Sequence, residues 1–421
     1  MSRLRPHSLG FTLLLGALVT LAAFSTDMGL PVLAETGRDL GVTASTAALT
    51  LSVFMAGFAL GPLVFGPVSD RVGRRPVLIA GTAAFACFGA LGAFAQSLPA
   101  LLVWRFLMGA AAGACQVLVL ATVRDLFEGA EARARQSYVN LAAGVAPIVA
   151  PTLGVWLATL GGWRAIYGAL AGGGLVLLAL VAWRLGESVP HRGGTPLTVR
   201  GTLASYGRVL RHPVSLGYSL VVALGFGALF AYVSGSSLVL IGVMGVPQRT
   251  YGLLFALPSL GLMAGAFLNA RLSRRGASHT RLIAAGLAAQ AAIALALLAL
   301  AATRVLGPAA LIGLLVANNL AQGIVRPNAA QGALEPMPEI AGVASAVLTG
   351  LQMLLGAGAS AIAAALFDGR SAVAMTGTMA VCATLAAAVY ALVVRRAERR
   401  RPLHAAPREP AVDAPGAAAA A

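Results

Sequence analysis

The chain has 421 residues, of which 58% are hydrophobic and only 10% are charged, whereas soluble globular proteins are about 45–50% apolar and about 25% charged. This composition excludes an ordinary soluble domain, and the long unbroken apolar runs exclude a transmembrane β-barrel. The net charge of +16 does not indicate a nucleic-acid partner, because all 30 basic residues are Arg and their positions follow the loops between the apolar runs.

Twelve apolar runs, each long enough to cross a bilayer, follow one another along the chain. A spanning helix needs about 20 apolar residues, and irregular backbone cannot face lipid. The first run is too long for a cleaved signal peptide. The sequence therefore predicts an all-α membrane protein whose spans lie near residues 9–33, 45–67, 77–97, 101–122, 137–159, 164–184, 214–243, 251–270, 282–302, 306–325, 341–366 and 372–394.

A polar interval at residues 186–212 divides the spans into two sets of six. It separates a predicted N-terminal bundle at residues 1–185 from a C-terminal bundle at residues 213–395. Residues 396–421 lack apolar periodicity and are predicted to form a disordered tail.

Arginines are concentrated in alternate loops, which predicts the orientation. If the N-terminus is cytoplasmic, the opposite face receives only five arginines, namely Arg38, Arg164, Arg249, Arg304 and Arg370. The positive-inside rule then places both termini, the interval 186–212 and the tail in the cytoplasm, with the spans in the inner membrane.

Asp27 in the first span is the only acidic residue well inside an apolar run. It lies about 18 residues, or 27 Å of helical rise, after Leu9. An ionised carboxylate is costly at this depth, which favours a carboxyl group that gains and loses a proton. Alternatively, Asp27 caps a distorted turn before Pro31 or pairs permanently with an Arg.

The loop between the second and third spans has a counterpart in the other half of the chain. GPVSDRVGRRP at 66–76 and GAFLNARLSRR at 265–275 both place Gly four residues before Asp or Asn and then a basic cluster. The offset of 199 residues is close to half the chain. This repeat predicts two parallel halves with a site between them, as in transporters.

Physical roles can be predicted for residues in the first copy. We expect Asp70, at the end of the second span, to accept hydrogen bonds from a neighbouring helix N-terminus. Gly66 is expected to allow close helix approach, and Gly73 a tight turn. A plain basic loop would explain the arginines but not the glycines or Asp70.

The fourth span carries a charged residue near each end. Arg105 lies a few residues inside it and could either extend outward or point into a cavity. Asp125 lies at the other end, where Arg74 or Arg75 is expected to reach it.

Other candidate residues lie in the remaining spans. Pro147, Pro151 and Gly154 would bend or thin the fifth helix. Buried polar groups need a partner or a water-filled cavity, and aromatic rings offer surface to an apolar small molecule. For any one polar residue, however, a hydrogen bond between helices is the more usual explanation, and most of the Phe residues are expected in the core or facing lipid. The predicted cavity residues are Phe54, Asn140, Tyr232, Phe255, Asn319 and Gln352.

No cofactor or metal site is predicted. Cys87, Cys115 and Cys382 lie in apolar runs without ligand spacing. The five histidines lie in loops or tails, and no two acids share a span interior, which argues against an intramembrane enzyme. The absence of Lys and of a G-x-x-x-x-G-K-[ST] loop argues against a nucleotide-driven pump.

Residues 66–76 closely resemble the signature between helices two and three of the major facilitator superfamily. Further stretches resemble the drug:proton antiporter branch related to bicyclomycin and chloramphenicol exporters, and the resemblance spans residues 9–394. They are TDMGLP at 26–31, RFLMG at 105–109, ATVRDLF at 121–127, APIVAPTLG at 146–154, GWRAIY at 162–167, AYVSGSS at 231–237, RPNAA at 326–330 and AGVASAVLTGLQ at 341–352. The chain departs from the common pattern at Gly29 and Val155.

The resemblance implies two pseudo-symmetric six-helix bundles and a bacterial monomer that exchanges protons for hydrophobic or amphipathic drugs such as phenicols. It places Arg105 in proton coupling with Asp27 and residues 147–154 in an antiporter-type helix. It also implies a gating motif made of Gly66, Asp70, Arg71, Gly73, Arg74 and Arg75 together with Asp125. Transport of a small polar metabolite, such as a sugar or amino-acid derivative, is the alternative, although it would call for more buried charge than one Asp.

Overall fold

The computed structural model describes residues 5–188 and 199–399, and within these ranges every regular element is a helix. The first part contains α1 (Leu9–Asp27), η1 (Leu30–Val32), α2 (Leu33–Asp39), α3 (Ala44–Val72), α4 (Arg74–Ala93), α5 (Leu98–Leu126) and α6 (Gly129–Arg184). The second part contains α7 (Val199–Arg211), α8 (Pro213–Ser237), η2 (Leu238–Val243), α9 (Gln248–Arg274), α10 (His279–Ala302), α11 (Pro308–Leu334), η3 (Pro338–Ile340), α12 (Ala341–Ala365), α13 (Val373–Val389), η4 (Tyr390–Val394) and α14 (Arg395–Arg399).

Eleven of the described helical stretches are long and apolar enough to cross a membrane, and one of them supplies two crossings. Helix α6 has 56 residues but is interrupted at Gly161 and Gly162, where Gly162 has a φ of 64° that residues with a Cβ rarely adopt. The segments on either side of this kink correspond to the fifth and sixth predicted spans. The prediction of an all-α protein with twelve transmembrane helices is confirmed.

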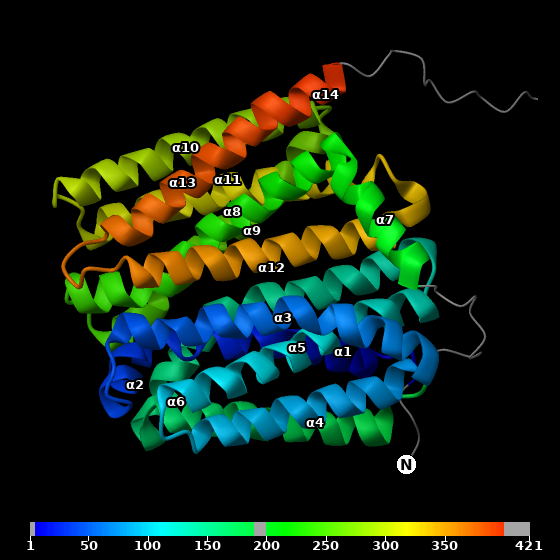
Figure 1. Cartoon of the computed structure of the whole chain (residues 1–421), viewed down its shortest axis with the longest axis horizontal. Helices are drawn as coiled ribbons and strands as arrows, with labels where there is room; N and C mark the ends of the chain where they lie inside the picture. Colours follow the sequence, from blue (N-terminus) through cyan, green and yellow to red (C-terminus); the bar gives the residue numbers. More distant parts are fainter. Residues whose placement is uncertain (1–4, 189–198, 400–421) are drawn as a thin grey trace, which may run out of the picture.

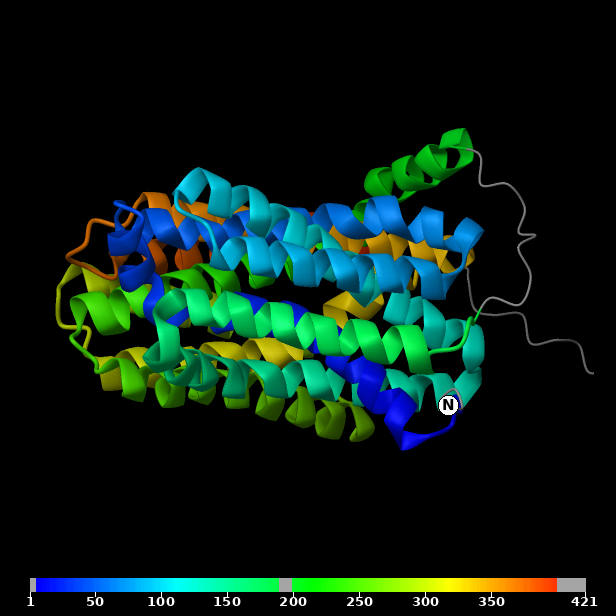
Figure 2. The same ribbon diagram turned by 90° about the horizontal axis from the view of Figure 1, so that it is seen from below.

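The helices form two halves that lie side by side in Figure 1, and Figure 2 looks at the molecule from the side of the N-terminal half. Helices α1 to α6 form the N-terminal half, and α8 to α14 form the C-terminal half. Each half has an apolar core of its own, and a third core joins them by packing Leu51 and Met55 of α3 together with Tyr232 and Phe255 of the other half.

Helices α3 and α5 cross closely because glycines face backbone at the crossing. A Cβ at Gly57 or Gly61 of α3 would overlap backbone oxygens of α5, and a Cβ at Gly109 or Gly113 of α5 would overlap backbone oxygens of α3. Such contacts leave no room for a larger residue.

Helices α9 and α11 cross in the same way in the C-terminal half. Gly265 faces the carbonyl of Leu320, and Gly323 faces the carbonyl of Leu262. The expected role of Gly66 in close helix approach is wrong, however, because a Cβ there would meet nothing within 4 Å. Gly66 lies beyond the crossing, toward the end of α3, so its counterpart Gly265 packs closely while Gly66 does not.

The two halves touch mainly toward one end of the molecule. We call it the Gly41 end (residues 40–43, 94–97, 161–162, 244–247, 303–307 and 366–372) and the opposite one the Gly73 end (residues 73, 127–128, 185–188, 275–278 and 335–337). Among the described residues, two side-chain hydrogen bonds join the halves. Ser52 Oγ donates to Ser360 Oγ at 2.8 Å, and Gln248 Nε2 donates to the Pro31 carbonyl at 2.8 Å. Both lie toward the Gly41 end.

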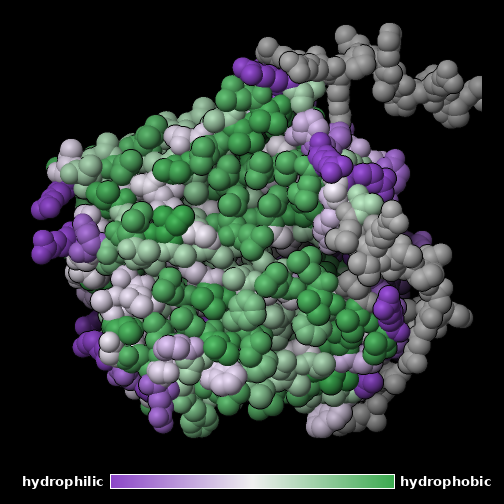
Figure 3. Space-filling view, viewed as in Figure 1, coloured by the Kyte–Doolittle hydropathy of each residue, from purple (hydrophilic) through white to green (hydrophobic). Residues whose placement is uncertain are grey.

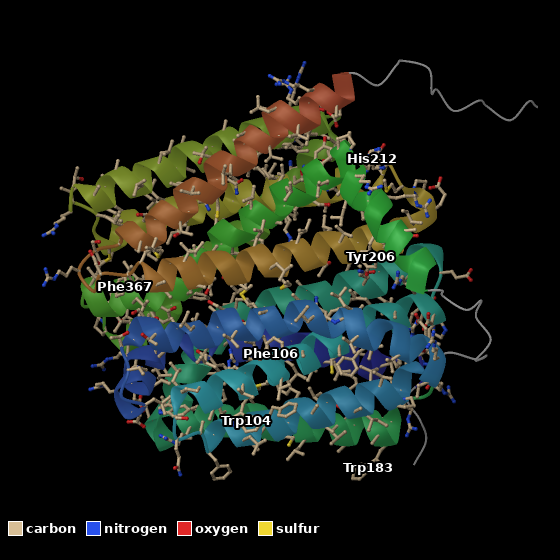
Figure 4. All side chains as sticks on the ribbon, in the orientation of Figure 1. Trp104, Phe106, Trp183, Tyr206, His212 and Phe367 are labelled. Carbon is tan, nitrogen blue, oxygen red and sulfur yellow. The ribbon has the colours of Figure 1, made fainter. Side chains whose placement is uncertain are left out.

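The predicted central loop is partly helical. Helix α7 packs Val209 against Ala344 and Val347 of α12, while residues 189–198 lie outside the described part. Figure 4 shows Tyr206 on α7 and His212 at its junction with α8. The last helix continues through Arg399 as α14, so residues 396–399 of the predicted disordered tail are helical, and the rest of that tail is likewise outside the described part.

The surface agrees with a membrane-embedded protein. In the view of Figure 3, hydrophobic residues cover most of the visible side, and hydrophilic residues gather at the two ends. The chain is a multi-pass membrane protein.

Candidate functional site

Asp27 is the last residue of α1, at a break in the first predicted span. The chain continues through Met28 and Gly29 into η1, which carries Pro31 near its start. The Asp27 side chain is only 4% exposed, and Thr26 Oγ1 donates to its Oδ1 at 2.9 Å. It neither caps the turn before Pro31 nor forms an ion pair with any Arg in the described part of the chain. Neither alternative reading of Asp27 matches this arrangement.

Two tyrosines of the C-terminal half lie within electrostatic range of Asp27. They are Tyr232 of α8 and Tyr251 of α9. Tyr251 Oη lies 2.7 Å from Ser236 Oγ, whereas the buried Tyr232 hydroxyl has no hydrogen-bond partner among the described residues. Tyr232 stacks on Phe255 with ring centroids 5.6 Å apart. Asp27 therefore lies in the region where the halves meet, which also holds a buried phenol without a hydrogen-bond partner among the described residues.

Arg105 points into the N-terminal half rather than outward. Its Nη1 donates to Ser25 Oγ at 2.6 Å, and its Nε donates to the Thr50 carbonyl at 3.2 Å. The guanidinium lies over the Phe54 ring at 4.4 Å, and the side chain is 3% exposed. Arg105 thus joins α5 to α1 and α3, and it contacts α1 two residues before Asp27.

A small cavity adjoins Arg105 and the residues just before Asp27. Its volume of about 20 Å³ has room for about one water molecule. Ser25, Thr26 and Arg105 are among its lining residues. The Thr26 hydroxyl at this cavity is the group that binds Asp27, so polar groups run from Arg105 to the carboxylate.

The predicted gating residues cluster at the Gly73 end. Arg74 is at the centre, with Nη1 2.5 Å from Asp70 Oδ1 and Nε 2.9 Å from Asp125 Oδ2. Gly73 makes the turn between α3 and α4 with a φ of 107°. Arg75 donates to the Ala182 carbonyl at 2.6 Å instead of reaching Asp125. Arg71 is exposed and has no ion pair with another described residue.

Glu187 takes the role that was expected of Asp70. Its Oε1 accepts from the Arg74 backbone N–H at 2.8 Å, and its Oε2 accepts from the Arg75 N–H at 3.2 Å, so its carboxylate caps the N-terminus of α4. Asp70 instead pairs with the Arg74 side chain. The expectation for Asp70 is therefore corrected. Glu187 carried no signal in the sequence, because it is 113 residues from Arg74 and lies in a polar interval.

The antiporter-helix residues pack near Asp27. Pro147 and Pro151 both lie inside α6. A Cβ at Gly154 would overlap the Met28 carbonyl, and the adjoining Thr152 contacts Gly252 of the opposite half. This part of α6 therefore packs against the break after Asp27 and against α9.

The predicted cavity residues are enclosed in this structure. Phe54, Tyr232, Phe255, Asn319 and Gln352 are all buried. Asn319 Nδ2 donates to the Pro258 carbonyl at 3.1 Å, whereas Gln352 Nε2 has no partner among the described residues. The side chain of Asn140 lies outside the described part of the chain. No group of three or more His, Cys, Asp or Glu in the described part could hold a metal ion.

Comparison with known proteins decides the family. The model of the Major Facilitator Superfamily matches residues 14–360. The chain belongs to this superfamily. Its fold and family were thus predicted correctly, and membership makes it a transporter rather than an enzyme.

Relatives within the superfamily include two resistance proteins. The chain is 29% identical to the bicyclomycin resistance protein homolog of Haemophilus influenzae, over 92% of this chain and 96% of that protein. It is 32% identical to the chloramphenicol resistance protein of Pseudomonas aeruginosa, over 81% of this chain and 80% of that protein. The same fold occurs in the crystal structure of a bacterial homolog to the human lysosomal transporter Spinster, in an inward-facing and occupied conformation. The TM-score is 0.72 at 16% identity, and the match covers 94% of this chain and 98% of that one.

Proposed function

We propose that this chain is a proton-coupled antiporter that exports hydrophobic or amphipathic drugs across the bacterial inner membrane by alternating access. The observation that carries the proposal is Asp27, the only acidic side chain among the described residues that is buried. It lies between the halves and has no cation bound to it. Intramembrane ionisable groups of this kind are typical of proton relays.

Asp27 would couple the two fluxes through competition. Protonation removes the charge and allows the carboxyl group to stay buried, whereas the ionised form calls for water or a bound substrate. Arg105 would hold Ser25 and the adjoining part of α1 in place. The Tyr232 hydroxyl, which has no hydrogen-bond partner among the described residues, would donate to Asp27 in another state of the cycle. Proton and drug would therefore occupy the site alternately.

The same proposal assigns the two ends of the molecule. The arginine-rich loops support a cytoplasmic position for the Gly73 end and for both termini. On this assignment, the hydrogen bonds between the halves lie on the outer side of the membrane, and substrate would enter from the cytoplasm. The Asp70, Arg74, Asp125 and Glu187 cluster would act as the gate at the Gly73 end, with Gly66, Arg71 and Arg75 around it.

The names of the relatives support the substrate class. One is a bicyclomycin resistance protein homolog and another is a chloramphenicol resistance protein, and both cover most of this chain. Phe54 lies against Arg105, and Tyr232 stacks on Phe255 in the opposite half. Aromatic rings of this kind suit an apolar drug with few polar groups. We further propose that the transporter acts as a monomer.

The test is transport by the purified protein in liposomes with an imposed proton gradient. We expect the wild type to move chloramphenicol against its gradient, and Asp27→Asn to lose gradient-driven transport by at least 10-fold while keeping downhill exchange. Asp39→Asn is the matched control, because it makes the same chemical change at an exposed carboxylate paired with Arg164. Gradient-driven transport that survives in Asp27→Asn would contradict the coupling assignment. Movement of a sugar or amino acid, with no drug transported, would contradict the exporter assignment.

A further inference from the structure

Arg326 is a charged residue at membrane depth that the proposed coupling and gating do not use. It lies on α11, 18 residues after Pro308 and 8 residues before Leu334, which is about 27 Å and 12 Å of helical rise from the two ends. Its side chain is nevertheless exposed. Charged side chains at such depth face the bundle interior or a water-filled space rather than lipid.

The surroundings of Arg326 show which way it faces. Its guanidinium lies 6.0 Å from the ring centroid of Phe226 on α8, and Phe226 packs against Phe230 with centroids 4.6 Å apart. A Cβ at Gly356 would contact both Phe226 and Met55, and Met55 belongs to the opposite half. Phe226 therefore borders the region where the halves meet, so Arg326 is directed toward the space between them.

The Arg326 charge forms no ion pair and no hydrogen bond with another described residue. Its guanidinium lies over the Phe226 ring. Arg105, the other intramembrane Arg at comparable depth, is buried and is held by Ser25, Thr50 and Phe54. The contrast indicates that Arg105 is part of the scaffold and that Arg326 is open to a ligand.

The chemistry of the site selects the ligand. A guanidinium presents a planar fork of N–H donors that binds a carboxylate with two parallel hydrogen bonds. Phe226 beside it is buried, and Phe230, which packs against Phe226, is half-buried and offers aromatic surface near the same place. An amphipathic molecule with a carboxylate next to an aromatic ring matches both features.

We infer that Arg326, Phe226 and Phe230 form a subsite for the carboxylate end of aromatic anionic substrates that enter between the halves from the Gly73 end. The inference rests on the proposed export function and names a substrate class for it. Arg326 binds the carboxylate, Phe230 contacts the ring, and Phe226 packs against both Arg326 and Phe230. The subsite lies in the half of the molecule opposite to Asp27 and Arg105.

Binding of a matched pair of probes to the purified full-length protein tests the subsite without any transport. Nalidixic acid carries an aromatic carboxylate, and its methyl ester has the same ring system without the charge. We expect the wild type to bind the acid at least 10-fold more tightly than the ester in isothermal titration calorimetry. Arg326→Gln should remove this preference, and Arg326→Lys should keep part of it, because Lys retains the charge but not the planar fork.

Arg271→Gln is the matched control, because Arg271 is exposed on α9 at the Gly73 end and the substitution removes the same charge. It should leave the preference unchanged. Equal binding of acid and ester by the wild type, or an intact preference in Arg326→Gln, would overturn the subsite. A preference that disappears in nanodiscs of phosphatidylglycerol but not of phosphatidylcholine would assign Arg326 to lipid headgroups and would also overturn it.

The subsite and the export function fail in different ways. If chloramphenicol transport does not depend on the proton gradient while Arg326→Gln still loses its preference for the acid over the ester, the antiporter proposal is wrong and the subsite stands. If chloramphenicol transport is coupled in both wild type and Arg326→Gln while the acid preference is absent, the subsite is wrong and the antiporter proposal stands.

Discussion

Arg105 keeps its charge inside the N-terminal half without a carboxylate among its described contacts. The Thr50 carbonyl, the Ser25 hydroxyl and the face of the Phe54 ring take up its donors and charge. Each of these groups belongs to α1 or α3. Because a buried unpaired charge is strongly destabilising, the position of Arg105 depends on all three contacts, and it fixes α1 just before Asp27.

Replacing Arg105 tests this arrangement. Arg105→Lys keeps the charge but cannot reach Ser25 and Thr50 together while stacking on Phe54, and hydrogen bonds of charged groups contribute about 1.5–3 kcal/mol each. We expect proton-driven transport in liposomes to fall at least 10-fold and the melting temperature to drop. Arg164→Lys, at a 40% exposed side chain, should stay within twofold of the wild type. Equal transport by Arg105→Lys and the wild type would contradict a positioning role.

At the scale of single residues, the sequence was informative where a chemical type was out of place. Asp27 could be found because it is an acid within an apolar run. The direction of Arg105 could not be predicted, because it depends on Ser25 and Thr50, which are 80 and 55 residues away along the chain. Glu187 and Tyr251 were missed for the same reason, whereas Tyr232 was predicted as a cavity residue. Arg326 was noted only as part of the family motif RPNAA, and nothing in the sequence indicated that its side chain is exposed.

Among the helices, α4 depends on a residue far from it in sequence. Glu187 closes the N-terminus of α4, and the Gly73 position leaves room for its carboxylate, since a Cβ there would lie 2.6 Å from Oε2. The negative charge of the capping carboxylate is also stabilised by the positive end of the helix dipole at the N-terminus of α4. The end of α6 is thereby attached to the turn that carries the gating residues.

Removing this cap should destabilise the N-terminal half. We expect Glu187→Ala to lower the free energy of unfolding by about 0.5–2 kcal/mol, the usual cost of losing an N-cap. Glu128→Ala is the control, because Glu128 precedes α6 without capping it by a hydrogen bond. Chemical denaturation followed by tryptophan fluorescence measures both variants. An equal loss in the two variants would show that the Glu187 contacts contribute nothing specific.

Helix α7 shows the limit of composition as a guide to elements. The interval 186–212 is polar enough to be interpreted as a loop, yet Val209 is buried against Ala344 and Val347. Tyr206 packs against the same cluster three positions earlier, which is the spacing of one helix face. A periodicity measured on this interval alone would have indicated the helix, but its partner on α12 could not have been inferred.

For the molecule as a whole, the twelve spans and their division into two sets of six followed from apolar run lengths. The relative placement of the halves did not. It depends on contacts such as Ser52 with Ser360 and Gly252 with Thr152, which join residues far apart in sequence. Nothing in the local pattern distinguishes these small residues from the many others that line helix crossings.

A covalent link between Ser52 and Ser360 tests whether the halves must separate toward the Gly41 end. Their Oγ atoms are 2.8 Å apart, so the double variant S52C/S360C should form a disulfide on oxidation. We expect oxidised protein to lose at least nine-tenths of its transport in liposomes, and reduction to restore it. Each single Cys variant, oxidised in the same way, controls for damage and for the native cysteines. Full transport by the cross-linked protein would show that this contact stays closed throughout the cycle.

Asp27, the one buried carboxylate among the described residues, determines how the proposed exchange responds to the membrane potential. If one proton enters for each drug that leaves, the charge moved per cycle depends on the drug, with zero for a cation, one for a neutral molecule and two for an anion. Moving one charge across the membrane is worth about 2.3 kcal/mol per 100 mV. At 100 mV this corresponds to a ratio of external to internal drug concentration of about 50-fold for a neutral drug and about 2,000-fold for an anion. The membrane potential would therefore favour clearance of acidic molecules over cationic ones at equal pH gradient.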